Sequence, residues 1–100
     1  MADEPEIFWT AEANRNLDQI ILYLKTEWTV KEIQKFIQKL NKAVLLISKR
    51  PELFRLTNHK DQLRKCVLSK HTSIFYKETN SKIYIVSLFD NRQDPKKMEH

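Results

Sequence analysis

The chain has 100 residues, of which 41% are hydrophobic and 31% are charged, and its formal net charge is +5. These values predict a single folded domain over residues 1–100 and exclude a chain that is disordered throughout. The basic balance favours an acidic partner, such as nucleic acid, an anionic membrane or an acidic protein.

The first half of the chain predicts a short strand followed by two helices. Residues 7–9 are apolar and aromatic, which is typical of a strand. Apolar residues then recur at helical spacing over residues 11–27, directly after Thr10, which can cap the start of a helix. Thr29 opens a capping box for a second amphipathic helix, which we expect to end at Pro51. Because the link between the helices is so short, we expect an antiparallel helical hairpin.

The second half of the chain predicts a loop and three strands. Residues 51–62 show no clear period, and their polar part is typical of a surface loop. Three apolar runs follow over residues 63–68, 73–78 and 82–89, with connections short enough for hairpins. The sequence thus predicts an α+β fold: an N-terminal strand, an antiparallel helical hairpin, and a three-stranded antiparallel meander with the helices packed on one sheet face.

Glycine is absent from the chain, which constrains its turns. Turns that need a positive φ must then use asparagine or aspartate, which tolerate that conformation best among the other residues. The candidates that fall between periodic segments are Asn58, Asp61, Asn80 and Asn91.

Arg64 is the first candidate for a functional side chain. Strand alternation places Arg64 and Lys65 on opposite faces of the sheet, so one of them faces the helices. Arginine is the better half-buried residue, because its planar guanidinium can bond a carboxylate or several carbonyls. Two roles remain open for Arg64: a structural hydrogen-bonding centre, or a residue that recognises an anion.

Arg92 is the second candidate, because it follows directly after the last predicted strand. A side chain at this place can stand uncovered at the rim of the sheet, and Lys96 and Lys97 follow it closely. We expect these three residues to contact a phosphate or an acidic group of a partner, and we expect Arg92 to support no core. The alternative is that Arg92 is an ordinary solvated surface charge.

Enzyme chemistry has weaker candidates. His71 can act as a general acid or base, although a lone histidine in a hairpin turn is usually exposed. Cys66 lies in an apolar run and is typical of a core residue rather than a nucleophile. The spacing of His59, His71 and His100 does not fit a metal site, so we expect no metal and no other cofactor.

The chain shows no sign of a membrane segment. No stretch approaches the roughly 18 apolar residues that span a bilayer. The first six residues carry a net negative charge, unlike a secretory signal. We therefore expect a cytoplasmic protein.

The order of these segments resembles the RelE/ParE superfamily, the toxins of type II toxin–antitoxin systems, over residues 6–97. Four stretches carry the resemblance: KRPELFR (49–55), LRKCVL (63–68), HTSIFYK (71–77) and IYIVSLFDNRQDP (83–95). The resemblance implies a small α+β toxin domain and a co-encoded antitoxin as its partner. It also implies one of two targets, because RelE-like members cut mRNA on the ribosome without metal, whereas ParE-like members poison DNA gyrase.

The residues at the RelE-like positions favour the second target. RelE-like nucleases place an arginine where this chain has Ser73, a second arginine at Arg92, and a late tyrosine near Met98. At these three positions, only Arg92 matches the RelE-like residue. The RQDP stretch (92–95) fits a pattern common among ParE-like members. The resemblance thus predicts a toxin that inhibits growth through DNA gyrase. The alternatives are a ribosome-dependent mRNA interferase with Arg92, Arg64 or His71 as catalytic candidates, and a protein-binding module without toxicity.

Overall fold

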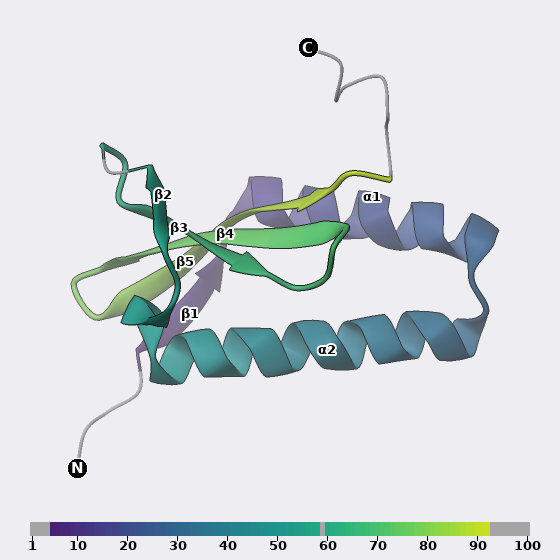
Figure 1. Ribbon diagram of the computed structural model, residues 1–100, viewed down its shortest axis with the longest axis horizontal. Helices are drawn as coiled ribbons and strands as arrows, with labels where there is room; N and C mark the ends of the chain where they lie inside the picture. Colours follow the sequence, from purple (N-terminus) through teal and green to yellow (C-terminus); the bar gives the residue numbers. More distant parts are fainter. Residues whose placement is uncertain (1–4, 59, 93–100) are drawn as a thin grey trace.

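The computed structural model describes residues 5–58 and 60–92, which fold into two long helices and a five-stranded sheet (Figure 1). The helices lie side by side as a hairpin, joined near Trp28. The strand order is β1-β5-β4-β3-β2, with β1 parallel to β5 and all other neighbours antiparallel. The elements are β1 (Glu6–Trp9), α1 (Ala11–Glu27), α2 (Val30–Lys49), the 3₁₀ helix η1 (Pro51–Leu53), β2 (Leu56–Asn58), β3 (Leu63–Val67), β4 (Thr72–Thr79) and β5 (Lys82–Asp90). The predicted α+β fold, with its helical hairpin and meander, is confirmed.

The stretch from 51 to 62, predicted as a loop, contains a strand. The three residues of β2 pair with β3, through Leu56 opposite Arg64 and Asn58 opposite Leu63, with an irregularity between the two pairs. A three-residue strand is too short to show an alternating apolar pattern. Its pairing with β3 defines it instead. The loop prediction is therefore wrong at β2.

Side chains at the start of α1 fasten the helix to β5. Thr10 caps α1 by accepting from the amide of Ala13 at 3.0 Å, and its hydroxyl donates to the carbonyl of Val86 at 2.8 Å. Further along, the amide of Leu88 donates to the side-chain oxygen of Asn16 at 3.1 Å. Since β1 pairs with β5 only as far as Ile85, Asn16 satisfies a β5 amide beyond the end of β1. These bonds fix where β5 ends relative to the helices.

The core lies between the helical hairpin and one face of the sheet. Cys66 belongs to it with 3% exposure, which confirms its predicted core position, and burial raises the pKa of its thiol. Within the described ranges 5–58 and 60–92, no helix is long and apolar enough to cross a membrane. The buried apolar residues are Ala13, Ile20, Leu24, Phe36, Leu40, Ile47, Cys66, Leu68, Ile74, Tyr76, Ile83, Ile85 and Leu88.

Positive φ angles occur without glycine in two places. Asn80 and Ser81 have φ of 51° and 64°, a consecutive pair that suits the two-residue hairpin between β4 and β5. Gln62 has φ of 57°. The prediction for Asn80 is confirmed, but the expectation that only asparagine or aspartate would take a positive φ is wrong at Gln62 and Ser81. Asn58 lies in β2 instead of a turn, and the positive φ expected at Asp61 occurs at the next residue, Gln62.

Candidate functional site

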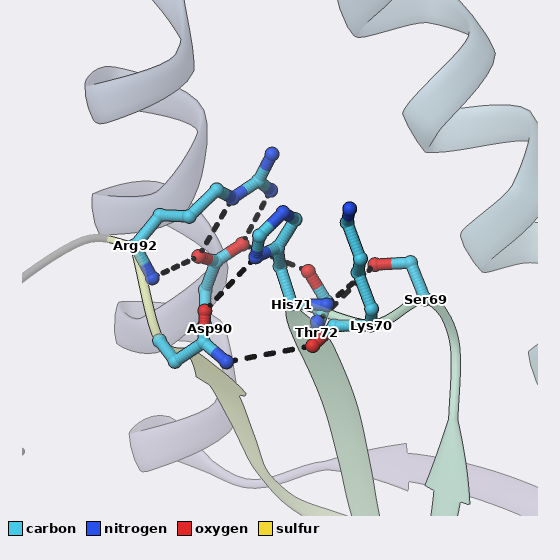
Figure 2. A network of polar contacts seen from close by, with 7 residues as sticks. Ser69, Lys70, His71, Thr72, Asp90 and Arg92 are labelled. Atoms are coloured by element: carbon cyan, nitrogen blue, oxygen red, sulfur yellow. Dashed lines mark hydrogen bonds and ion pairs between the residues drawn. The ribbon is translucent and has the colours of Figure 1, made fainter.

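A buried carboxylate organises the end of β5 (Figure 2). The Asp90 side chain has no exposed surface. One of its oxygens accepts from the Thr72 hydroxyl at 2.8 Å and from Nη2 of Arg92 at 2.7 Å. The other accepts from the backbone amide and Nε of Arg92, at 2.9 and 3.1 Å. Burial raises the pKa of Asp90, but the bonds from Arg92 and Thr72 outweigh it and hold that pKa below its usual value.

The surroundings of Arg92 differ from those expected. Its side chain is 20% exposed, it is paired with a fully buried carboxylate, and its guanidinium carbon lies 4.8 Å from the centre of the Trp28 ring. The hydrogen bond to Asp90 raises the pKa of the guanidinium. The expectation of an uncovered arginine that supports no core is therefore wrong. Arg92 is a structural ion-pair partner whose outer edge reaches the surface.

Arg92 borders a groove of about 300 Å³ between α2 and the turn after β3. Phe36 and Leu68 are buried and form its apolar floor. Lys35 and Lys39 are exposed and form a basic rim, because residues four apart share one face of a helix. We call this the hairpin groove. Its lining residues are Trp28, Glu32, Lys35, Phe36, Lys39, Leu68, Ser69 and Arg92.

The link between the helices shapes one end of the hairpin groove. The amide of Trp28 ends α1 by donating to the carbonyl of Leu24 at 2.7 Å. Thr29 then begins α2 through the predicted capping box, with reciprocal bonds to Glu32 of 3.0 and 3.2 Å. The Trp28 ring packs edge-on against Phe36, one turn beyond Glu32, at 6.3 Å between ring centres. A two-residue connection with a rigid cap thus presents the tryptophan to Arg92.

His71 lies beside this cluster, in the turn between β3 and β4 (Figure 2). Its Nδ1 is 3.0 Å from the side-chain oxygen of Asn91, and its carbonyl accepts from the Asn91 amide at 3.0 Å. The Ser69 hydroxyl oxygen accepts from the amides of His71 and Thr72, both at 3.2 Å. The structure thus brings His71 and Arg92 to one end of the sheet, where His71 helps to lock the turn.

Arg64 belongs to a different place. It lies on the helix-facing side of β3, as predicted, and its Nη1 donates to the carbonyls of Phe54 at 2.5 Å and Glu52 at 3.5 Å. About 13 Å of strand separates Arg64 from Leu68 in the hairpin groove. Arg64 therefore holds the turn after η1, which favours the structural role over anion recognition.

Other predicted site residues lie outside the described part of the chain. These are Lys96, Lys97, His59, His100 and Met98, so the structure does not place them. Within the described ranges, no group of three or more His, Cys, Asp or Glu side chains gathers where a metal ion could bind.

The sequence reasoning missed Asp90, Thr72 and Trp28. For Asp90 a signal was present: alternation along β5 places it on the inner face with Leu88, and an aspartate there needs a cation or hydrogen-bond donors. For Trp28 the signal was its place between two helices, directly before the capping box. Neither pattern predicts that Arg92 is the arginine that contacts Asp90 and Trp28.

Comparison with known proteins identifies the family. Residues 7–95 match the family described as the ParE toxin of the type II toxin–antitoxin system parDE. No curated protein sequence matches the chain significantly.

Solved structures share the fold at low sequence identity. A structure described as the chromosomal ParDE toxin–antitoxin system from P. aeruginosa is 16% identical, with a TM-score of 0.73, covering 87% of this chain and 96% of that chain. The E. coli DinJ–YafQ toxin–antitoxin complex is 11% identical, with a TM-score of 0.63, covering 90% and 96%. A copper-bound mutant toxin from Helicobacter pylori is 15% identical, with a TM-score of 0.53, covering 88% and 96%. Since the family match spans nearly the whole described structure, the chain belongs to the ParE toxin family of type II toxin–antitoxin systems.

Proposed function

We propose that this protein inhibits growth in the cytoplasm by binding DNA gyrase and that a co-encoded antitoxin neutralises it. Membership of the ParE family supports this target over ribosome-bound mRNA. The RQDP stretch (92–95) supports it as well, because that pattern is common among ParE-like members. The proposal requires a surface that recognises a macromolecule, and it requires no bond-breaking chemistry.

The ion pair between Arg92 and Asp90 is the observation that most supports a gyrase target over RNA cleavage. An arginine that stabilises a phosphorane must present its N–H groups to the phosphate oxygens. Here Nε and Nη2 both donate to a fully buried carboxylate. Arg64 is also engaged, since its Nη1 donates to the backbone carbonyls of Glu52 and Phe54. This arrangement suits a rigid binding surface better than an RNA-cleaving centre.

The hairpin groove is the surface to which we assign target binding. Its floor offers a place for an apolar side chain, and the basic residues Lys35 and Lys39 lie on its rim beside one acidic lining residue, Glu32. A protein segment with an apolar anchor and acidic neighbours fits this combination, because the anchor supplies affinity and the charges supply register. Lys96 and Lys97 follow Arg92 in the sequence and add positive charge to the same end of the chain.

Induced expression in a bacterial host tests the proposal. We expect growth arrest with intact transcripts in primer-extension mapping, and arrest relieved by the protein from the neighbouring reading frame. Cuts at codon boundaries in those transcripts would contradict a gyrase target and favour the mRNA interferase. Unaffected growth would refute both toxic functions and leave a binding module.

Charge reversal separates the hairpin groove from the rest of α2. The double variant Lys35→Glu/Lys39→Glu changes only exposed side chains, so the fold should persist while growth arrest is lost. The matched control is Lys31→Glu/Lys42→Glu, on the same helix and outside the groove lining. If both double variants arrest growth equally, the hairpin groove is not the target-binding surface.

A further inference from the structure

The sheet has a second face that the helices do not cover. Along β4, Ile74 and Tyr76 are fully buried against the hairpin, so Phe75 and Lys77 point to the opposite side. Along β5, Tyr84 lies between fully buried Ile83 and Ile85 and takes the same outward direction. We call this the open face. Its central residues are Phe8, Lys65, Phe75, Lys77, Lys82 and Tyr84.

Several aromatic rings also gather on the open face. Phe8 is 39% exposed and stacks on Tyr84, with 5.5 Å between ring centres and 24° between the ring planes. Phe75 lies on the neighbouring strand, and Phe89, near the end of β5, is 41% exposed. Large apolar rings that share one uncovered surface indicate an interaction site.

Lysines alternate with these rings. The Lys65 ammonium lies 5.9 Å from the centre of the Phe75 ring, and the Lys82 ammonium lies 5.7 Å from that of Phe8. Lys77 is the cross-strand partner of Tyr84, and these two residues line a hollow of about 450 Å³. The surface therefore offers flat rings and positive charges at strand spacing.

The acidic residues of these strands do not cancel this charge. Glu6 shares the outward direction of Phe8 at the edge strand, opposite Lys82 in register. Glu78 of β4 is the cross-strand partner of buried Ile83 and so lies on the helix side of the sheet. Asp90, at the other end of the sheet, faces the hairpin and is paired with Arg92. The centre of the open face thus keeps the charge of Lys65 and Lys77.

We propose that the open face binds single-stranded nucleic acid, with bases stacked on Tyr84, Phe75 and Phe8 and phosphates held by Lys65, Lys77 and Lys82. Single strands expose base faces to aromatic rings and carry a negative charge at each nucleotide, and this surface complements both features. A duplex keeps its base faces stacked and cannot use the rings. A purely apolar partner would leave the lysine charges without counterparts.

The inference goes beyond the gyrase proposal and stands on other residues. The hairpin groove lies on the helix side of the sheet and shares no lining residue with the open face. Failure of one proposal therefore leaves the other intact.

Fluorescence anisotropy of labelled oligo(dT) and oligo(rU), about 12 nucleotides long, tests the proposal with the purified full-length chain. We expect binding that weakens between about 50 and 200 mM salt. The double variant Phe8→Leu/Tyr84→Leu removes two rings and should weaken binding about tenfold or more. The relative affinity of the two oligomers then tells whether DNA or RNA is preferred.

Two further double variants complete the experiment. Lys65→Glu/Lys77→Glu should weaken binding similarly while every aromatic residue is kept, which covers the case in which the ring variant does not fold. Lys31→Glu/Lys42→Glu on α2 makes the same charge change and should bind like the unmodified chain. The proposal is overturned if neither oligomer binds, if only the α2 variant loses binding, or if a duplex of equal length binds as tightly. It is equally overturned if sedimentation shows a dimer that the ring variant abolishes, because a second copy would then occupy the face.

Discussion

Replacing Arg92 by alanine tests how the end of β5 is stabilised. The substitution removes two charge-assisted hydrogen bonds to Asp90, those from Nε and Nη2, and leaves the bonds from the Thr72 hydroxyl and the backbone amide of residue 92. Each lost bond to a charged group contributes about 1.5–3 kcal/mol. The guanidinium site is 20% exposed, so water can partly replace it. We therefore expect a net loss of about 2–3 kcal/mol rather than the full cost of an unpaired buried charge.

Urea unfolding monitored by circular dichroism measures this loss. By the usual size scaling, a destabilisation of this magnitude lowers the melting temperature of such a domain by about 10–20 °C. The matched control is Arg15→Ala, which breaks an arginine–glutamate pair whose side chains are 59% and 54% exposed, and which should cost about 0.5 kcal/mol or less. If the two alanine variants unfold at the same urea concentration, the Asp90–Arg92 pair does not stabilise this fold.

Three further predictions concern pH and turns. Because the pKa of folded Asp90 lies below its ordinary 3.8, the Asp90–Arg92 pair stabilises the fold above about pH 4, and this stabilisation is lost as the pH falls below that value. Asp90→Asn should therefore make the free energy of unfolding less dependent on pH below about pH 4. Burial raises the pKa of Tyr76 from 10.0 to about 12, so the free energy of unfolding should fall by about 2–3 kcal/mol as the pH rises from 10 to 12. Tyr76→Phe should abolish this contribution to the decline, and it should cost about 1 kcal/mol at neutral pH because the hydrogen bond to the Pro51 carbonyl is lost. Ser81→Gly removes the strain of a φ of 64° and should raise the free energy of unfolding by about 0.5–1 kcal/mol. The control Ser73→Gly, inside β4, should lower it, and equal effects of the two variants would contradict the assigned turn.

Much of the architecture could be predicted because local chemistry specifies it. Thr29 and Glu32 form the predicted capping box, and the helical spacing before and after them marks both helices. The long strands β4 and β5 alternate clearly between buried and exposed residues. Each of these signals lies within a few residues of the element that it predicts. The edge strand β2 lacks such a signal, since pairing with β3 defines it.

The candidate site was harder to predict because its contacts join distant parts of the chain. Arg92 was identified as important, but its partner Asp90 and the stacked Trp28 were not. An arginine at the end of a strand can turn outward to solvent or back toward a buried carboxylate, and the sequence alone is compatible with both. The choice depends on where α1 ends, and that point lies in the opposite half of the chain.

Gyrase-mediated DNA cleavage with the purified protein tests the proposed toxicity most directly. The unmodified chain and Lys31→Glu/Lys42→Glu are expected to accumulate linear DNA from a supercoiled plasmid, whereas Lys35→Glu/Lys39→Glu is expected to accumulate none. A chain that arrests growth yet leaves gyrase cleavage unchanged would contradict the account.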